Sequence, residues 1–273
     1  MSRTDDLDVV IVTYNSADHL RGCVAALPTG TRVIVIDNAS DDGSAEVAEQ
    51  LGCSVLRNDR NEGFGAAVNR AVREQVRAAT VLLLNPDARI DGPNLQRLRD
   101  ALGGERVAVA GPRLRDPAGT EQRPWWDFPS PRLAWREAIG LHRLRPPDFG
   151  RSADVPFVVG ACFLIRTEAW REVGGFDERF WLYGEEADLC QRLHNASWRV
   201  RYVAEAHASH VGGASGDGPD DPFIREHFVR GSDRFVLTHH GTPALVSYRV
   251  ATLAGSALRL LALPRHDARR VTR

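Results

Sequence analysis

The stretch VLLLNPD, residues Val81–Asp87, places four consecutive apolar residues directly before a polar cluster. A continuous apolar run of this length is typical of a strand that is buried on both faces of a sheet. The same change from apolar to polar residues occurs in IVTYN at Ile11–Asn15 and in VIVIDNAS at Val33–Ser40. We therefore expect parallel strands covered by helices. Their polar ends should lie together at the carboxyl edge of the sheet, where open α/β sheets bind ligands.

The segments between these strands have the spacing of amphipathic helices. In Ser16–Leu27, for example, Leu20, Cys23 and Val24 fall on one side. The pattern predicts an α/β fold with a mostly parallel central sheet and helices on both faces. Pro112–Phe149 shows little periodicity and is expected to be a long irregular stretch. Further strands are expected at 54–57, 107–110, 156–165 and 199–203, and further helices at 41–51, 65–76, 167–173, 186–195 and 223–239.

Composition excludes several classes of protein. The net charge of −1 gives no indication of a nucleic-acid partner, and none is expected. All 35 basic residues are arginine, so chemistry that needs a Schiff-base or P-loop lysine is excluded. The four cysteines are far apart in the chain, which favours unpaired thiols in a cytoplasmic protein. The polar N-terminus shows no secretory signal pattern.

Further motifs follow the three strand ends in a fixed order. They are NEGFG at Asn61–Gly65, Gly160-Ala161, VGGFDE at Val173–Glu178, YGEEADLC at Tyr183–Cys190 and HVGGAS at His210–Ser215. Together the set resembles the family 2 inverting glycosyltransferases with a GT-A fold, and it is most similar to their bacterial rhamnosyltransferase-type branch. The resemblance implies a GT-A domain at 1–240, with a nucleotide-binding half at about 1–111 and an acceptor-binding, catalytic half at about 112–240. A basic helical extension would occupy 241–273.

The resemblance implies that a nucleoside-diphosphate sugar binds along the strand ends. Asp37 has a chemical reason to take part, because its carboxylate can accept a hydrogen bond from a ribose hydroxyl or a base N–H. Capping of the next helix by Asp37 remains an alternative. Of the arginines 225, 230 and 234 on the late helix, at most two can reach a diphosphate together. The nucleotide-sugar contacts expected from the resemblance are Thr13, Tyr14, Asn15, Asp37, Asn61, Gly63, Phe64, Asn85 and Arg234.

A divalent metal, Mg²⁺ or Mn²⁺, is the cofactor that the resemblance implies. Carboxylate oxygens suit such hard cations, and Asp87 follows the most apolar strand. The family usually has Asp-x-Asp at this point, whereas this chain has Asn85, which leaves Asp87 as the anionic ligand. His210 is the expected second ligand because a glycine-rich segment follows it, and His207 competes for the role. A simple Asn-Pro-Asp turn that closes the strand remains the structural alternative.

Three acids open a predicted helix: Glu185, Glu186 and Asp188. Acids in a first turn stabilise a helix through its dipole, which is the structural alternative to a catalytic role. In the resembling family the second acid of the pair is the catalytic base and is normally Asp; here it is Glu186. Glu186 is therefore the expected base, with Glu185 as the competing assignment. Asp188 is expected to orient a neighbour or to pair with an arginine.

The predicted function is inverting transfer of a sugar from a nucleoside-diphosphate sugar to a hydroxyl of a cell-envelope or lipid-linked glycan. The branch resemblance favours rhamnose from a dTDP-sugar, with a UDP-sugar as the other donor considered. Two alternatives are a sugar nucleotidyltransferase and a non-catalytic nucleotide- or glycan-binding module. The chain lacks the basic Pro-Lys loop of the first, and the second predicts that the acids at 87 and 186 are absent.

The segment from Pro243 to Pro264 is mostly apolar but contains Arg249 and Arg259, which makes it a poor membrane-spanning helix. Further arginines follow it, at 265, 269, 270 and 273. Two interpretations stay open. The segment lies on the anionic inner face of the cell membrane, or it packs on the domain as a terminal helix.

Overall fold

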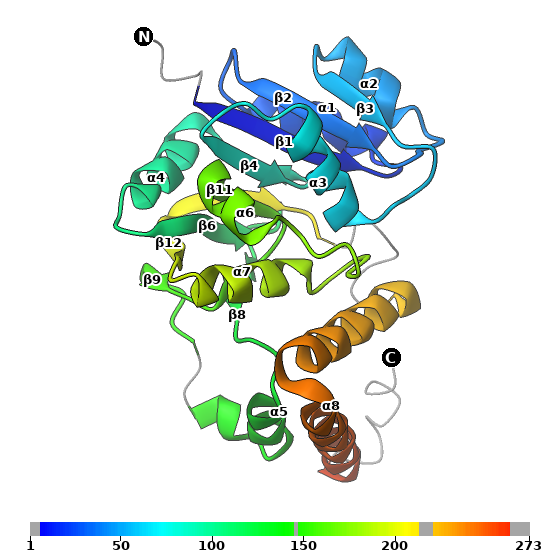
Figure 1. The fold of residues 1–273 in the computed structure, drawn as a ribbon, viewed down its shortest axis with the longest axis vertical. Helices are drawn as coiled ribbons and strands as arrows, with labels where there is room; N and C mark the ends of the chain where they lie inside the picture. Colours follow the sequence, from blue (N-terminus) through cyan, green and yellow to red (C-terminus); the bar gives the residue numbers. More distant parts are fainter. Residues whose placement is uncertain (1–5, 145–146, 213–220, 263–273) are drawn as a thin grey trace.

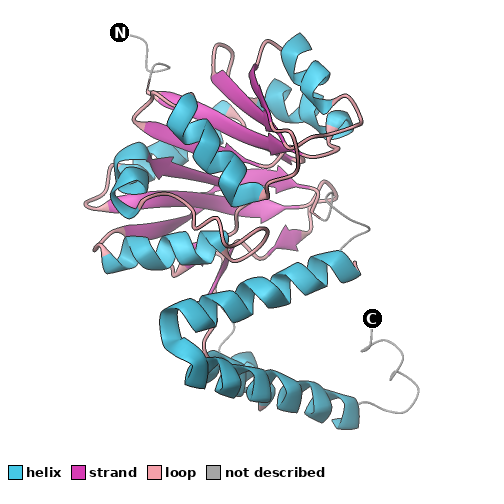
Figure 2. Ribbon diagram, turned by 45° about the vertical axis from the view of Figure 1, so that its right-hand side comes forward, coloured by secondary structure: helices cyan, strands magenta, loops and turns pink. Residues whose placement is uncertain are grey.

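The computed structural model describes residues 6–144, 147–212 and 221–262. Its centre is one large twisted sheet with helices on both sides, and a helical region projects from one end (Figures 1 and 2). The strand order along the main path of the sheet is β3-β2-β1-β4-β11-β6-β12-β5. The predicted α/β class, with a central sheet between helices and a C-terminal helical extension, is confirmed.

The first four strands are parallel and form one half of the sheet. They are β1 (Leu7–Thr13), β2 (Arg32–Asp37), β3 (Ser54–Arg57) and β4 (Thr80–Leu84). Two separate hydrophobic clusters explain why these strands carry apolar residues on both faces, since alternate residues of β1 face opposite sides. Val10 packs with α3 (Phe64–Glu74), whereas Val9 and Ile11 pack with α1 (Ala17–Ala26) and α2 (Ser44–Gln50).

The second half of the sheet is mixed. β11 (Cys162–Arg166) runs antiparallel between β4 and β6 (Val107–Arg115), and β12 (Arg199–His210) runs parallel to β6. α6 (Thr167–Val173) and α7 (Glu185–Asn195) cover the α3 side, and α4 (Gly92–Leu102) covers the other. Short strands complete it: β5 (Ala88–Arg89), β7 (Glu121–Gln122) and β9 (Ala153–Asp154), while β8 (Trp125–Trp126) and β10 (Phe157–Val158) form a separate pair.

Four expected ranges differ from the structure. The strand expected at 156–165 is two strands, β10 and β11, because the chain breaks at Gly160-Ala161 beside the pocket. β6 and β12 both extend well past the apolar runs that predicted them, since their pairing with each other continues to Arg115 and Ser209. The stretch 112–149 is also more regular than expected. It contains the end of β6, β7, β8, α5 (Pro131–Ala138) and a 3₁₀ turn at Leu141–Leu144.

The last helix, α8 (Pro222–Ala262), is two helices separated by a non-helical residue, Gly241 (φ 81°). The first part passes beside α7, and the second part packs against α5 at the lower end of the molecule in Figure 1. The helical part of the predicted extension lies here, whereas residues 263–273 lie outside the described residues. All four cysteines are unpaired, as expected.

Candidate functional site

A pocket of about 530 Å³ opens at the carboxyl ends of β1 and β4. The chain after each strand forms its floor, and the loop before α7 and the start of α8 form its walls. This is the edge at which the sequence predicted a ligand. The lining residues are Val12, Tyr14, Ser16, Asn38, Asn61, Gly63, Phe64, Asn85, Pro86, Asp87, Val159, Gly160, Ala161, Trp181, Leu182, Tyr183, Glu185, Glu186, His210, Asp221 and Phe223.

The polar residues after β1 divide between the pocket and the loops that support it. Tyr14 lines the pocket and is half exposed. Thr13 donates a 3.1 Å hydrogen bond to Oδ1 of Asp37, whose Oδ2 accepts from the backbone N–H of Ser40 at 3.1 Å. Asn15 accepts a hydrogen bond from the backbone N–H of Asp41.

Thr13, Asn15 and Asp37 are therefore engaged in holding these two loops, and none of them lines the pocket. The alternative in which Asp37 caps the next helix is not supported either, because α2 begins at Ser44 with Gly43 as its N-cap, and Asp37 instead holds the turn that contains Ser40. The pocket is lined instead by its neighbour Asn38, whose side-chain amide donates to the carbonyl oxygen of Gly63. The sequence pattern did not single out Asn38. Its position directly after a strand end was the available signal.

The loop at Asn61–Phe64 lies against the loop before α7. Asn61 Oδ1 accepts from the N–H of Gly63, and the N–H of Phe64 donates to the carbonyl oxygen of Trp181 at 3.0 Å. Gly63 has a φ of +85°, and a Cβ there would collide with that carbonyl oxygen and the Trp181 ring. Only glycine tolerates both the positive φ and the close contact with Trp181. Asn61, Gly63 and Phe64 all line the pocket, as expected.

Asp87 and His210 are neighbours on one side of the pocket. Asp87 Oδ1 lies 3.5 Å from Nε2 of His210, and both side chains are largely buried. Burial lowers the pKa of His210, and the nearby Asp87 carboxylate opposes that shift. The neutral ring retains a nitrogen lone pair. His207 is exposed and lies outside the pocket lining.

An oxygen and a neutral imidazole nitrogen are donors that Mg²⁺ or Mn²⁺ accepts, so the pair fits a divalent cation. Asn85, two residues before Asp87 in the chain, also lines the pocket. No group of three or more His, Cys, Asp or Glu suited to a metal occurs within the described ranges. The remaining ligands would have to come from a diphosphate and water.

Glu185 and Glu186 begin α7 directly after Gly184, whose φ is +90°. Each has one carboxylate oxygen that is buried and has no hydrogen-bond partner among the described residues. Burial raises the pKa of Glu185, and the charge of Glu186 raises it further. Burial also raises the pKa of Glu186, opposed by hydrogen bonds from backbone groups that include Gly160. Two carboxyl groups in the pocket therefore hold protons more tightly than ordinary glutamates, which is a property of general bases that work near neutral pH.

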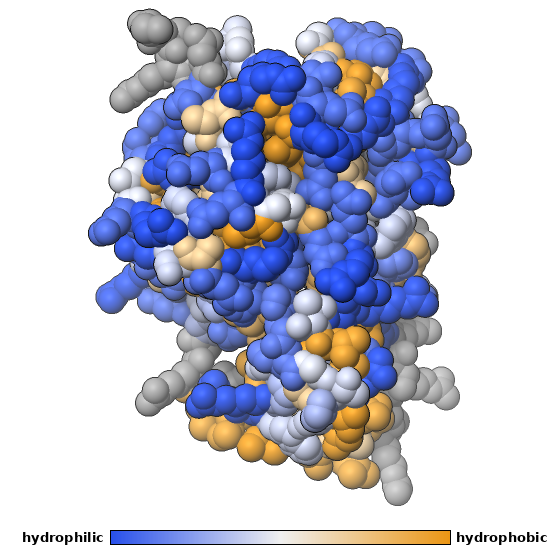
Figure 3. Space-filling view, in the orientation of Figure 1, coloured by the Kyte–Doolittle hydropathy of each residue, from blue (hydrophilic) through white to orange (hydrophobic). Residues whose placement is uncertain are grey.

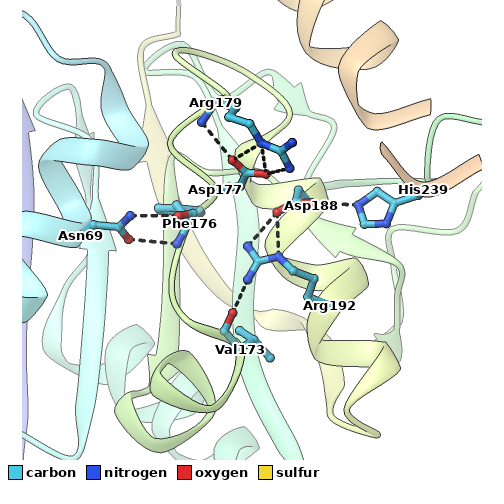
Figure 4. Close-up of polar contacts among 8 residues, drawn as sticks. All are labelled: Asn69, Val173, Phe176, Asp177, Arg179, Asp188, Arg192 and His239. Atoms are coloured by element: carbon cyan, nitrogen blue, oxygen red, sulfur yellow. Dashed lines mark hydrogen bonds and ion pairs between the residues drawn. The ribbon is translucent and has the colours of Figure 1, made fainter. Parts of the chain in front are cut away.

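Asp188 belongs to a separate network of polar contacts with Arg192 and His239 (Figure 4). It is 1% exposed and forms an ion pair with Arg192 at 2.7 Å, and its other oxygen accepts from His239 Nε2 at 2.8 Å. Arg192 also donates to the carbonyl oxygen of Val173. Asp188 is not among the pocket-lining residues, so the expectation that it pairs with an arginine describes it better than a catalytic role.

Arg234 is exposed on α8 and does not line the pocket, so the structure does not support a role in nucleotide binding for it. Arg230 forms an ion pair with Glu226 on the same helix. No arginine belongs to the described lining. Spacing along a helix cannot show which side faces the pocket, and α8 presents Phe223 there instead.

The fold and pocket define a GT-A-type glycosyltransferase. The structure of GalNAc-T7 with UDP, GalNAc and Mn²⁺ superposes with a TM-score of 0.65 at 18% identity, over 97% of this chain and 52% of that one. The chain thus spans about half of that protein. The Pyrobaculum calidifontis mannosyltransferase PcManGT, in complex with GDP-Man and Mn²⁺, gives 0.57 at 14% identity, over 98% of this chain and 78% of that one.

The model of glycosyl transferase family 2 matches residues 8–174, and that of glycosyl transferase family group 2 matches residues 147–256. The chain belongs to glycosyltransferase family 2. A Mycobacterium tuberculosis relative named N-acetylglucosaminyl-diphospho-decaprenol L-rhamnosyltransferase is 33% identical over 238 residues, or 76% of each chain. The Haloferax volcanii hexosyltransferase Agl10 is 23% identical over 217 residues, covering 76% of this chain and 67% of that one. The predicted glycosyltransferase activity is confirmed, in preference to a sugar nucleotidyltransferase and to a non-catalytic binding module.

Proposed function

We propose that this glycosyltransferase is metal-dependent and inverting, and that it transfers rhamnose or a related sugar from a nucleoside-diphosphate sugar to a hydroxyl of a lipid-linked glycan. One observation carries the proposal. The pocket has two acidic sites of different kinds: Asp87 with His210 on one side, and the buried pair Glu185 and Glu186 on the other. One suits a diphosphate-bound cation and the other suits removal of a proton.

In this mechanism Glu186 accepts the proton of the acceptor hydroxyl. The hydroxyl oxygen then attacks the anomeric carbon from the face opposite the leaving nucleoside diphosphate, which inverts the configuration. A buried carboxylate oxygen with no described partner is ready to accept that proton without first losing another hydrogen bond. Gly160 lies against Glu186: a Cβ at residue 160 would be 3.5 Å from Oε1. The absence of a larger side chain at 160 leaves room for an acceptor.

Negative charge develops on the diphosphate as it leaves, and no arginine belongs to the described pocket lining to balance it. A divalent cation supplies that charge stabilisation when bound. Asp87 and His210 would hold the cation, and Asn85 is placed to contact ribose or an ordered water beside it. Tyr14, Asn38, Asn61 and the Gly63 backbone surround the volume that remains for the nucleoside.

The donor and acceptor follow from the relatives. The Mycobacterium tuberculosis relative is named for transfer of L-rhamnose to a diphospho-decaprenol-linked sugar. This supports a dTDP-rhamnose-type donor, with a UDP-sugar as the second choice, and a lipid-linked acceptor in the cell envelope. Such an acceptor lies at the membrane surface, so a peripheral position on the inner face of the cell membrane accompanies the proposal.

An apolar face at the end of the molecule supports that position (Figure 3). By length and composition α8 qualifies as a membrane-spanning candidate, and because only 11% of its apolar segment is buried it is not a core helix. Gly241, however, interrupts the helix, and Arg249 and Arg259 lie in its second part. Lying on the surface suits it better than crossing. Arg132, Arg136 and Arg259 are exposed nearby and suit anionic lipid. The apolar face consists of the exposed side chains of Trp135, Ile139, Leu141, Leu144, Val246, Val250, Leu253, Leu258, Leu260 and Leu261.

The test is transfer of radiolabelled sugar from a panel of dTDP- and UDP-sugars to decaprenyl-diphospho-N-acetylglucosamine in detergent, with Mn²⁺ or excess EDTA. The proposal predicts product with a dTDP-deoxysugar, inverted at the anomeric carbon, and none with EDTA. Full activity in EDTA would contradict the metal requirement. A product with retained configuration would contradict the mechanism.

A further inference from the structure

Gln122, on β7, contacts the proposed metal ligand His210 from outside the pocket. Its Oε1 lies 2.9 Å from Nδ1 of the His210 ring, and its Nε2 lies 2.9 Å from the carbonyl oxygen of His210. A carbonyl oxygen only accepts, so the side-chain nitrogen must face it and donate. The amide orientation is thereby fixed, and Oε1 must accept the hydrogen of Nδ1.

This contact has a consequence for the other ring nitrogen. A neutral imidazole with its hydrogen on Nδ1 has its lone pair on Nε2. Nε2 is the atom that lies 3.5 Å from Oδ1 of Asp87. Two electron-pair donors therefore face each other within the pocket. A cation bound by both atoms would replace this repulsion with attraction.

Asp87 is held in a corresponding way. The backbone N–H of Gly212 donates to its Oδ2 at 3.1 Å, which turns Oδ1 toward His210. Gly212 has a φ of +76°, and a Cβ there would be 3.2 Å from Nε2 of Gln122. Glycine at this position therefore lets the Gln122 amide and the Asp87 carboxylate approach the same turn of backbone.

The strand that carries Gln122 is anchored independently of the pocket. Its neighbour Glu121 forms ion pairs with Arg113 at 2.6 Å and with Arg115 at 3.0 Å, both on β6. β7 also pairs with β6 through Leu114 and Gln122. The amide is thus presented from a fixed hairpin.

We propose that Gln122 is a positioning residue that fixes the Nδ1–H tautomer of His210 and so directs Nε2 toward a divalent cation held with Asp87. The inference rests on the proposed metal site. Partners of this kind orient a metal-ligating histidine and raise its basicity, and their loss typically lowers metal affinity about 10- to 100-fold.

The first test uses the unaltered protein. Long-range ¹H–¹⁵N correlation spectra of ¹⁵N-histidine-labelled protein at pH 8, with His210→Ala to assign the signal, report which nitrogen carries the hydrogen. We expect Nδ1–H for His210. An Nε2–H signal would overturn the inference without any change at Gln122.

The second test is titration with Mn²⁺ in the presence of UDP, followed by the electron paramagnetic resonance of free Mn²⁺. Gln122→Leu keeps the side-chain size and removes both hydrogen bonds, and it should weaken Mn²⁺ binding about 10- to 100-fold. Gln122→Glu keeps an acceptor for Nδ1–H and should retain the tautomer. Gln96→Leu makes the same substitution on α4, where it removes a hydrogen bond to Asp100 and has no contact with His210; it is the control and should bind Mn²⁺ as the wild type does.

The proposed metal site and the proposed role of Gln122 can be disproved separately. If His210→Ala leaves Mn²⁺ affinity unchanged, the proposed metal site is wrong. If His210→Ala weakens binding but Gln122→Leu changes neither affinity nor tautomer, the metal site stands and the role of Gln122 is overturned.

Discussion

Asp188 joins the helix that carries the proposed base to the C-terminal helix, through a 2.8 Å hydrogen bond between its Oδ1 and Nε2 of His239. The same carboxylate pairs with Arg192 one turn along α7, and Arg192 in turn donates to Val173 (Figure 4). Because Asp188 is 1% exposed, this network replaces the water that its charge would otherwise require. It holds α7 in place behind Glu185 and Glu186.

Replacing Asp188 should therefore destabilise the protein. Asp188→Ala leaves the half-buried Arg192 without its partner, and we expect a loss of about 3 kcal/mol in the free energy of unfolding, measured by urea denaturation. The matched control is Arg230→Ala, which removes an exposed pair on α8 and should cost less than about 1 kcal/mol. Equal losses in the two variants would show that the Asp188 network contributes nothing special.

The raised pKa values of Glu185 and Glu186 predict the pH dependence of transfer. A base works only when deprotonated, so activity should fall as the pH decreases through a pKa above the ordinary 4.5. The Glu186 charge raises the pKa of Glu185, so Glu185 still holds its proton while Glu186 ionises. Glu185→Gln therefore removes no negative charge in that pH range, and the acidic limb of kcat/KM should stay in place. An acidic limb centred below 4.5, or one that Glu185→Gln moves to a much lower pH, would contradict this assignment.

The two histidines should differ in their effect on the metal response. His210→Ala should raise the Mn²⁺ concentration needed for half-maximal transfer about 10-fold or more, because it removes one of the two proposed protein ligands. His207→Ala alters an exposed side chain outside the pocket and should leave that concentration unchanged. The opposite ranking in Mn²⁺-dependence assays would make His207 the ligand in place of His210.

Gly63→Ala tests whether the loop at Asn61–Phe64 must lie against the Trp181 backbone. The substitution adds a Cβ where φ is +85° and where Trp181 leaves no room. It should weaken nucleotide binding, measured by calorimetry, and destabilise the protein by more than strain alone. Gly30→Ala isolates the strain, since φ is +82° there and no atom lies within 4 Å of the added Cβ; about 1–2 kcal/mol is expected. Equal losses of stability and equal nucleotide binding in the two variants would show that the contact with Trp181 has no effect of its own.

The apolar face predicts binding to anionic vesicles. The double change Val250→Asn and Leu253→Asn should reduce binding in vesicle sedimentation at least about 10-fold, because each apolar side chain contributes about 1.5–3 kcal/mol when buried. Val229→Asn with Leu237→Asn alters two exposed apolar residues on the first part of α8 and is the control. Equal binding by both double variants would favour the packed terminal helix.

The sequence predicted the N-terminal half of the sheet well because β1, β2 and β4 each contain a continuous apolar run that ends in polar residues. β6 and β12 were underestimated because their later residues, such as Arg113 and His207, are polar and gain strand structure only from pairing with each other. The pocket residues on tight loops, including Asn61 and Gly63, were found through their glycines.

Side-chain direction explains the misplaced residues. Asp37 sits at the predicted strand end, yet its carboxylate turns to Thr13 and Ser40 rather than to the pocket. Gln122 lies 88 residues from His210 in the chain, and no local pattern links the two. Such contacts depend on the packing of distant segments.

The most direct test of the account compares Glu186→Gln with Glu185→Gln in transfer to a lipid-linked acceptor at saturating Mn²⁺. Glu186→Gln should retain donor and metal affinity but lower kcat about 10²- to 10⁴-fold, as loss of a positioned base does. Glu186→Asp should also impair transfer, about 10²-fold, because it withdraws the carboxylate by about one bond length. Glu185→Gln should affect the chemical step less. Near-normal transfer by Glu186→Gln together with inactive Glu185→Gln would contradict the account and assign the base to Glu185.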